Sequence, residues 1–515
     1  MIPMLVQDFL ETSAARRPEK TALICGGRRL AYAELDEMAN RLANALCERG
    51  VSRGDRVAIF LNNTVETVVG IFAIVKASAV FVVVNRTTKA DKLAFVLNNC
   101  QAVALITDDR ATAQGLTAKL VADVPSLKTV VLCGEGAEKL SASTSRSTDF
   151  ESLQRNTSAT RPARRNIDCD LACLIYTSGT TGEPKGVMSD HSNVVFASGS
   201  IISYLGNVES DVVLNVLPLS FDYGLYQLLM TFRFGGTLIL ENSFAYPAEI
   251  LKRLAQERVT GFPGVPTVFA MLLNMDLAAF DLSSLRYLTN TAAALPPSHI
   301  EAIRKKFPHV TMYSMYGLTE TKRTLYLPPE MLDKKPGSVG IAIPGTEVWV
   351  EDERGNRLNP GAVGELVARG RHVMRGYWEA PEATAARFRP GPVPGERLCY
   401  TGDLFRTDED GYMYFVGRKD DIIKSRGEKV APKEVENVLH ALAGVVEAAV
   451  VGVPDPLLGQ SIKAVIVRSD PNLTANAVLA HCRAHLEDFM TPKTVEFREA
   501  LPKSPSGKVR KEELV

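Results

Sequence analysis

The chain has 515 residues, of which 46% are hydrophobic and 23% are charged. This composition is typical of a soluble globular protein, and the length exceeds one ordinary domain, so more than one domain is expected. Lys plus Arg equals Asp plus Glu at 59 each, which argues against a general nucleic-acid-binding or membrane-binding surface.

The N-terminal segment lacks the basic start, apolar centre and small-residue cleavage site of a signal peptide. The longest apolar run, Val68 to Val84, contains Lys76 and Ser78 and is barely long enough to cross a bilayer. A buried helix that leads into a buried strand is the favoured interpretation. The eight cysteines are scattered without disulfide spacing. These features predict a cytoplasmic protein that does not span a membrane.

Short apolar runs alternate with helical patterns from residue 20 to about residue 340. They predict parallel α/β layers covered by helices on both faces. The polar stretch from Ser141 to Asn166 favours a solvated loop over a basic patch. The expected strands lie at residues 57–61, 80–84, 104–107, 129–132, 171–176, 212–219 and 235–240.

Turn-rich segments follow residue 340 and predict a small antiparallel β unit. From Asp421 onward, a pattern of helix, strand, turn, strand and helix predicts a separate domain. The expected fold class is α/β, with a large N-terminal domain of α/β layers plus a small β unit, and a small C-terminal α+β domain. We place the large domain at residues 1–419 and the small domain at residues 420–515.

A glycine-rich segment, YTSGTTGEPKGV at residues 176–187, follows the apolar strand expected just before it. Its glycines let backbone N–H groups turn toward an anion, its hydroxyls add donors, and Lys185 adds a positive charge. The segment predicts phosphate binding, with a flexible surface loop as the alternative. It is not a P-loop, because Pro184 precedes Lys185 and Gly186 follows it.

This segment resembles the signature of the adenylate-forming superfamily, which includes acyl-CoA synthetases, adenylation domains of nonribosomal peptide synthetases, and luciferases. Further motifs resemble the same superfamily and occur in its order, so the resemblance covers essentially the whole chain. The combination looks most like the bacterial free-standing AMP-forming acyl-CoA ligases. The further motifs are YGLTET (316–321), YTGDL (400–404), GRKDDIIKSRGEKV (417–430) and PKSPSGKVRK (502–511).

The resemblance implies a reaction in two halves. A carboxylate attacks the α-phosphorus of ATP to give an acyl-adenylate and pyrophosphate, and a thiol then displaces AMP. The implied cofactors are ATP and Mg²⁺, and the implied partners are a small-molecule carboxylic acid and either CoA or the phosphopantetheine of an acyl or peptidyl carrier protein. Both reactants of the first half are anionic, so positive charge is needed where negative charge gathers.

The matched motifs also imply roles for single residues. Glu320 would ligate Mg²⁺, Asp403 would accept both ribose hydroxyls, and Lys508 would bridge the carboxylate and the α-phosphate as the catalytic lysine. Because Lys508 lies on the small domain, that domain is expected to be mobile, with Asp420 as its hinge. The other implied nucleotide-binding residues are Thr177, Ser178, Gly179, Thr180, Thr181, Gly182, Lys185, Tyr316 (stacked on adenine), Thr319 (at the α-phosphate) and Arg418 (at the ribose or phosphate).

The acid pocket leaves alternatives open. Asp222 follows a phenylalanine, as in amino-acid-activating members, where such an aspartate pairs with the substrate ammonium. The first alternative is therefore a stand-alone amino-acid-activating enzyme that loads a carrier protein. The second is a catalytically silent nucleotide-binding protein, although such a protein would not need Lys508. Arg323 is a candidate for recognising a second polar group on the substrate. The expected pocket residues are Asp222, Tyr223, Tyr226, Met315 and Arg323.

Overall fold

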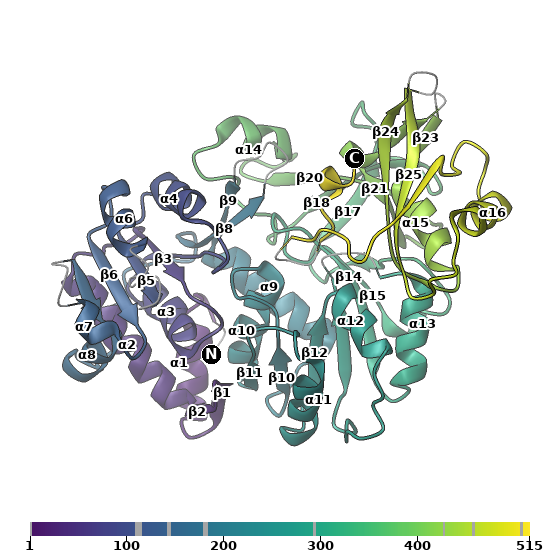
Figure 1. The fold of residues 1–515 in the computed structure, drawn as a ribbon. Helices are drawn as coiled ribbons and strands as arrows, with labels where there is room; N and C mark the ends of the chain where they lie inside the picture. The colour runs from purple at the N-terminus through teal and green to yellow at the C-terminus, as the bar shows by residue number, and fades with distance from the viewer. Residues whose placement is uncertain are drawn as a thin grey trace.

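The computed structural model describes residues 3–108, 116–141, 146–178, 184–291, 295–425, 428–455, 459–504 and 508–515. Two large helix-covered sheets form most of the molecule, and two smaller sheets follow them along the chain (Figure 1). The α/β class, with a separate β-rich C-terminal unit, is confirmed. Within the described ranges, every helix is too short or too polar to cross a bilayer.

The first large sheet has nine strands, and its central strands run parallel. At one edge β2 pairs antiparallel with β1, and at the other β15 pairs antiparallel with β14 and with the edge strand β16. In spatial order the strands are β16 (Ile341–Ala342), β15 (Leu325–Leu327), β14 (Thr311–Tyr316), β13 (Tyr287–Asn290), β12 (Gly261–Gly264), β10 (Val212–Asn215), β11 (Thr237–Leu240), β1 (Thr21–Cys25) and β2 (Arg28–Ala31).

The second large sheet has seven strands, and all neighbours run parallel except the last pair, β8 and β9. The glycine-rich segment joins this antiparallel pair. In spatial order the strands are β7 (Ser147–Asp149), β6 (Thr129–Cys133), β5 (Ala104–Asp108), β3 (Arg56–Phe60), β4 (Val80–Val83), β8 (Leu171–Ser178) and β9 (Pro184–Asp190).

Helices fill the space between the two large sheets and cover their outer faces, as the sequence pattern predicted. The inner layer holds α1 (Asp8–Arg16), α2 (Tyr32–Glu48), α3 (Val65–Lys76), α9 (His191–Leu205) and α10 (Asp222–Phe234). The outer helices are α4 (Ala90–Asn99) and α6 (Leu116–Asp123) on the seven-stranded sheet, and α11 (Pro247–Gln256), α12 (Pro266–Leu273) and α13 (Pro297–Lys306) on the nine-stranded sheet.

The apolar core is continuous through the inner layer. Phe72 of α3 stacks on Phe232 of α10 at 5.1 Å between ring centroids, and both side chains are fully buried. Leu238 of β11 and Ile59 of β3 belong to the same core cluster, so one apolar layer joins the two sheets. Burial of this many aliphatic and aromatic side chains is the main favourable term in folding.

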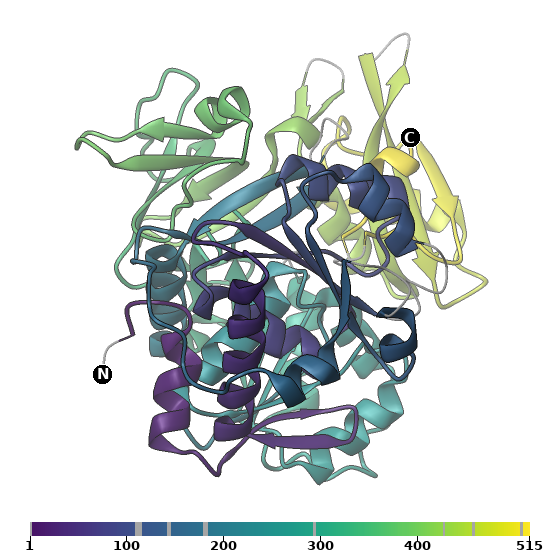
Figure 2. The ribbon, with the colours of Figure 1, turned by 90° about the vertical axis from the view of Figure 1, so that its left-hand side faces the viewer.

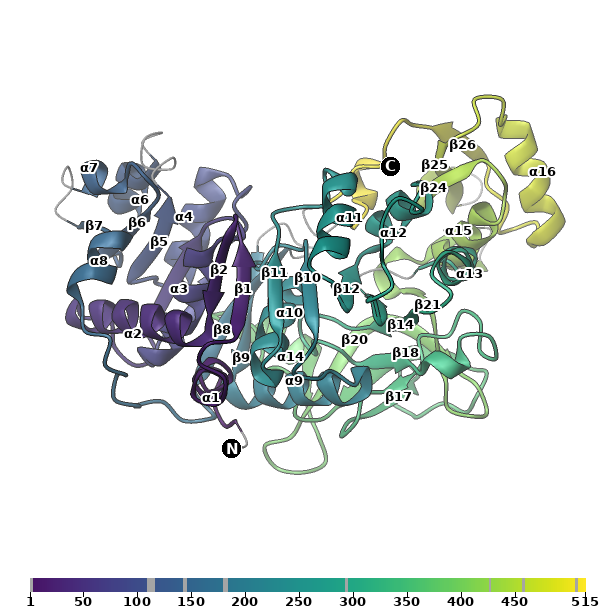
Figure 3. The same cartoon turned by 90° about the horizontal axis from the view of Figure 1, so that it is seen from below.

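The two smaller sheets lie at the same end of the molecule (Figures 1 and 2). The C-terminal sheet lies beside α12 and α13, far from β6 and β7 (Figure 3). The first smaller sheet contains β17 (Glu347–Glu351), β18 (Val363–Arg369), β20 (Arg397–Thr407), β19 (Phe388–Pro390) and β21 (Met413–Arg418), and the second contains β23 (Glu428–Val430), β22 (Ile423–Ser425), β25 (Gly459–Arg468), β24 (Val445–Asp455) and β26 (Thr494–Phe497).

Of the remaining helices, α15 (Pro432–His440) and α16 (Ala475–His485) flank the C-terminal sheet. The shorter helices are α7 (Ala137–Ser141), α8 (Phe150–Asn156) and α14 (Pro381–Arg387), and the 3₁₀ turns are η1 (Pro329–Met331), η2 (Lys419–Asp421) and η3 (Lys511–Glu513).

The expectation of a solvated loop from Ser141 to Asn166 is wrong for much of that stretch. It contains β7, which extends the seven-stranded sheet, and α8. Asp149 caps α8 by accepting hydrogen bonds from the backbone N–H groups of Glu151 and Ser152. The helix buries Phe150 and Leu153, and these two apolar residues are hidden in an otherwise polar sequence.

The strand predicted at 212–219 is also shorter than expected, because it ends at Asn215. The Asn215 side chain accepts from the backbone N–H of Leu217 at 3.1 Å and donates to the Leu217 carbonyl at 3.0 Å. These local bonds satisfy the backbone that a longer strand would have paired.

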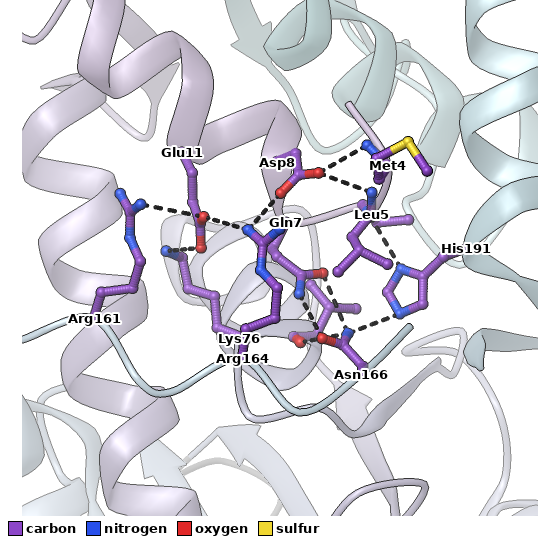
Figure 4. Close-up of polar contacts among 12 residues, drawn as sticks. Met4, Leu5, Gln7, Asp8, Glu11, Lys76, Arg161, Arg164, Asn166 and His191 are labelled. Atoms are coloured by element: carbon purple, nitrogen blue, oxygen red, sulfur yellow. Dashed lines mark hydrogen bonds and ion pairs between the residues drawn. The ribbon is translucent and has the colours of Figure 1, made fainter. Parts of the chain in front are cut away.

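A buried ion cluster holds the inner helices together (Figure 4). The Lys76 side chain, only 1% exposed, lies 2.9 Å from Glu11 of α1 and 2.8 Å from Asp36 of α2. From the segment after α8, Arg161 and Arg164 also pair with Glu11. Arg161 and Arg164, which the sequence predicted in a solvated loop, therefore pair with a buried carboxylate. Because each charge has a partner, the cluster can remain in the interior.

We expect Lys76→Met to lower the free energy of unfolding by about 3–5 kcal/mol, because it leaves two buried carboxylates with one cation fewer. Urea titration followed by far-UV circular dichroism measures this loss. The control Lys305→Met removes one partner of an exposed pair with Glu301 and should leave the midpoint unchanged. Equal midpoints for Lys76→Met and the unchanged protein would contradict a stabilising role for the cluster.

Candidate active site

One turn at the edge of the nine-stranded sheet carries several of the predicted site residues. It connects β14 to β15, and the Thr324 backbone N–H closes it by donating to the Tyr316 carbonyl at 2.9 Å. Tyr316 ends β14, while Thr319 and Glu320 lie within the turn. The turn leaves the carboxyl end of a parallel strand, which is where ligands bind in open α/β sheets.

Asp403 faces this turn from β20. Its carboxylate, buried with the residue 4% exposed, accepts a hydrogen bond from the Tyr316 hydroxyl at 2.6 Å. Arg418 is its register partner on β21, with 3.5 Å between Arg418 Nε and Asp403 Oδ1. Burial raises the pKa of Asp403, and the Tyr316 hydroxyl and Arg418 oppose that rise. Three predicted nucleotide-binding residues, Tyr316, Asp403 and Arg418, thus form one polar group.

Glu320 is held on its other side by Tyr377, which the sequence did not single out. The Tyr377 hydroxyl donates to Glu320 Oε1 at 2.5 Å, and Lys185 Nζ lies 5.7 Å from the centroid of the Tyr377 ring. Burial and the neighbouring Glu320 carboxylate raise the pKa of Tyr377 above its usual value. Tyr377 therefore links the glycine-rich segment to the turn of Glu320. It belongs to none of the motifs, so no sequence signal marked it.

Lys508 comes from the C-terminal segment and completes the group. The residue retains solvent exposure, but protein atoms crowd its ammonium. That burial lowers the pKa of Lys508, Arg418 lowers it further, and Asp403 and Glu320 raise it. The structure brings together residues that are more than 300 positions apart in the sequence.

Part of the predicted phosphate loop lies outside the described residues, namely Gly179, Thr180, Thr181 and Gly182. The loop is shorter than the sequence predicted, because Thr177 and Ser178 end β8 and Pro184 begins β9. Thr177 pairs with Lys185 across these strands. The hairpin thereby brings Lys185 to the end of β8, beside the loop.

Asp420 lies between the two smaller sheets. It is exposed and belongs to the 3₁₀ turn η2, which directly follows β21 and precedes β22. Near this connection, His440 of α15 packs against His299 of α13 with ring centroids 5.7 Å apart. The C-terminal unit therefore contacts the nine-stranded half of the molecule in this arrangement.

At the other end of the site, Asp222 begins α10 and pairs with cations of the same turn that carries Glu320. Its Oδ1 lies 2.8 Å from Lys322 Nζ, and its Oδ2 lies 3.8 Å from Arg323 Nη1. Negative charge is also favourable at a helix N-terminus. The carboxylate thus has internal partners and does not depend on a substrate ammonium. Lys322 was missed, although it stands beside the predicted Arg323.

Of the other predicted pocket residues, Tyr226 and Tyr223 lie against Lys322 and Arg323. Tyr223 and Tyr226 lie on α10 and are buried. The Tyr223 hydroxyl lies within hydrogen-bonding distance of Thr289, at 2.7 Å from its carbonyl oxygen. Met315 is buried in β14, and its sulfur accepts a hydrogen bond from Tyr204 at 2.9 Å. All five predicted pocket residues therefore lie in one region between α10 and β14.

Comparison with known proteins identifies the family of the chain. The AMP-binding enzyme family matches residues 10–378, and the C-terminal domain of AMP-binding enzymes matches residues 434–508. A long-chain-fatty-acid–CoA ligase of Bacillus subtilis (strain 168) is 31% identical over 99% of this chain and 94% of its own length. A feruloyl-CoA synthase of an Amycolatopsis species is 35% identical over 97% of this chain and 96% of its own.

The structure is also similar to that of an anthranilate CoA ligase in complex with anthranoyl-AMP. The two share 29% sequence identity and a TM-score of 0.91, and the alignment covers 100% of this chain and 97% of the other. The resemblance noted from the sequence motifs is therefore confirmed. The chain belongs to the AMP-binding enzyme family of adenylate-forming proteins, and it is an AMP-forming acid–thiol ligase.

Proposed function

We propose that this ligase carries out both half-reactions at the polar group formed by Asp403, Glu320, Lys185 and Lys508. The observation that carries the proposal is the geometry of the buried carboxylates: Tyr316 and Arg418 contact Asp403, and Tyr377 orients Glu320. The pKa of Lys508, which Asp403 and Glu320 raise against the effect of burial, supports it. These carboxylates and the lysine are on different elements, and only the folded chain assembles them. Such a group can bind a nucleotide and stabilise charge that develops during phosphoryl chemistry.

In this proposal the nucleotide binds in one orientation. Asp403 accepts the ribose hydroxyls, because an ionised carboxylate offers more acceptor sites than the Tyr316 hydroxyl occupies. Tyr316 then offers its ring to the adenine, and Thr319 lies on the α-phosphate side of the same turn. Lys185 and the glycine-rich loop bind the phosphates that leave as pyrophosphate.

Glu320 also fits a magnesium ion. Its carboxylate is a hard oxygen donor of the kind that Mg²⁺ prefers, and the Tyr377 hydroxyl orients it. When bound, the metal supplies positive charge to the phosphates of ATP.

Lys508 serves the first half-reaction. The acid carboxylate and the α-phosphate are both negative, so their approach is unfavourable without a cation between them. An ammonium placed there binds an oxygen of each reactant and offsets the negative charge that collects in the transition state. Burial is the first cause of the lowered pKa of Lys508. The lysine therefore loses its proton more easily than an exposed lysine, and it is the protonated form that acts in this step.

The second half-reaction requires the small domain to rotate, so that Lys508 leaves and a thiol can reach the acyl-adenylate. Residues 1–419 form the large domain and residues 420–515 the small one in this proposal, with Asp420 at the boundary. Its location in an exposed 3₁₀ turn between two sheets supports this assignment. CoA is the acceptor, and the phosphopantetheine of a carrier protein, which ends in the same thiol, is the alternative.

The acid substrate lacks an amino group beside its carboxylate. Asp222 is already paired with Lys322 and Arg323, and a substrate ammonium at this point would meet two cations. The relatives named for long-chain fatty acids and for ferulic acid have substrates without such a group. The amino-acid-activating alternative thus loses the observation that favoured it.

We expect Lys508→Ala to slow adenylate formation by about 100- to 1,000-fold or more, the loss typical of one transition-state donor. Thioester formation from a supplied acyl-adenylate should remain nearly unchanged. Pyrophosphate release measures the first half and thioester formation the second. Arg510→Ala, two residues further along and paired with Glu513, is the control. Equal losses in both halves would mean that Lys508 has a structural role.

For the hinge, we expect Asp420→Pro to preserve adenylate formation and to slow thioester formation by orders of magnitude. Proline fixes φ near −65° and removes an N–H, so it restricts the rotation that the second half requires. Single-turnover measurements of each half test this. Asp420→Ala, which keeps the backbone free to rotate, is the matched control. Wild-type rates of both halves in Asp420→Pro would place the hinge elsewhere.

A further inference from the structure

An excess of positive charge is buried at the acid end of the site. Lys322 and Arg323 bring two cations to one carboxylate, that of Asp222, and the three side chains are 0%, 3% and 5% exposed. A buried charge without a counter-ion is unfavourable by several kcal/mol. We call these three residues the acid-end triad.

The surroundings of the triad do not neutralise it. The ring of Tyr226 lies 5.7 Å from Lys322 Nζ, and the ring of Tyr223 lies 4.5 Å from the Arg323 guanidinium. Such faces attract cations but carry no net charge. In the described part of the chain, Asp222 is the only acidic residue within ion-pair distance of either cation.

Hydrogen-bonding capacity is also left over. Arg323 Nη1 donates to the Lys322 carbonyl at 3.2 Å, and Lys322 Nζ lies 2.8 Å from Asp222 Oδ1, whereas Arg323 Nε has no hydrogen-bond partner among the residues that the structure describes. A guanidinium has five N–H donors and an ammonium three. Buried donors of this kind normally have acceptors, so the triad is suited to receive acceptor oxygens from a ligand.

The backbone holds Lys322 in this position at a cost. Its φ of 60° lies in the left-handed region, which a residue with a Cβ adopts rarely and which costs on the order of 1 kcal/mol or more. The same turn carries Glu320, two residues earlier. With this conformation at Lys322, the side chains of Lys322 and Arg323 reach Asp222 of α10, while Glu320 contacts Tyr377.

We propose that Lys322 and Arg323 bind a second anionic group on the acid substrate, so that the substrate class is acids with a carboxylate at the end remote from the reacting one. This inference rests on the proposed function, because it requires the acid to lie between α10 and the turn of Glu320. A remote carboxylate supplies the missing negative charge and two acceptor oxygens. It also matches the planar fork of an arginine.

Other acid classes fit the triad less well. An alkyl chain offers no acceptor and leaves the excess charge uncompensated. An ammonium adds a third cation, and like charges in a buried site repel strongly. A site built to bind a charged group discriminates against analogues that lack it far more than an apolar pocket discriminates between hydrocarbons.

The test is a set of matched acids, each offered as the diacid, its half methyl ester and the corresponding amino acid with the amine at the remote end. The set spans short and medium aliphatic chains and benzene dicarboxylic acids. Pyrophosphate release gives kcat and KM for each. We expect the preferred scaffold to be used at least about 100-fold better as the diacid than as the half ester, and worst as the amine.

Arg323→Met leaves the close pair of Lys322 and Asp222 intact and removes the excess charge. It should lower kcat/KM for the diacid by about 100-fold, mainly through KM, while the half ester changes little. Arg323→Lys should restore part of the preference. Arg28→Met, an exposed arginine paired with Glu66, is the control for a lost arginine elsewhere, and circular dichroism confirms folding of each variant.

The outcomes separate this inference from the proposed function. If the half ester or the amine is used as well as the diacid, or if Arg323→Met lowers all three equally, the triad does not select a remote carboxylate and the inference is wrong. An equal loss would instead place the cations at the reacting carboxylate. If no acid releases pyrophosphate, the proposed function fails, and the inference fails with it.

Discussion

The reaction joins two anions, a carboxylate and a phosphate. The site must therefore supply positive charge for the first half-reaction and remove it for the second. A carboxylate and a phosphate repel each other, so a cation must be present at the moment of attack. In the proposed function, Lys508 supplies that cation from the C-terminal unit, seven residues before the end of the chain, while Asp403 and Glu320 lie on the part that precedes this unit. The two half-reactions can therefore have different charge environments at one site. This separation explains why the nucleotide-binding residues are spread over so many elements.

The rigid part of the molecule supports this arrangement. The inner helix layer packs against both large sheets, and the ion cluster of Lys76 holds three of its elements together. The turn after β14 carries Glu320, Lys322 and Arg323 next to one another, and Lys322 and Arg323 pair with Asp222 of α10. In the proposed function, this single turn sets the distance between the phosphate end and the acid end of the site. Burial of charge is unfavourable in general, and in the cluster of Lys76 each charge has a counter-ion.

The sequence predicted the fold class and five strands of the seven-stranded sheet, because apolar runs bounded by turn residues report burial directly. Of the nine-stranded sheet it predicted only β10 and β11. It missed α8, whose two buried apolar residues lie in a polar stretch, and it extended the strand that ends at Asn215. Among the residues predicted from motifs, Tyr316, Asp403 and Arg418 contact one another in the structure. Tyr377 and Lys322 were not predicted, since each acts through a contact with a residue distant in sequence. The partners of Asp222 likewise depend on how α10 meets the turn, which no local pattern encodes.

The central claim is that the C-terminal unit takes up two arrangements during one catalytic cycle. Spin labels on Lys305→Cys of α13 and Arg483→Cys of α16, in a protein whose exposed Cys169 is replaced by serine, report the distance between the large and small domains. With an acyl-adenylate bound, we expect one distance population, with Lys508 at the nucleotide. Addition of a non-reactive CoA analogue should shift most molecules to a second, distinct distance. An identical distance distribution in both states would contradict the account.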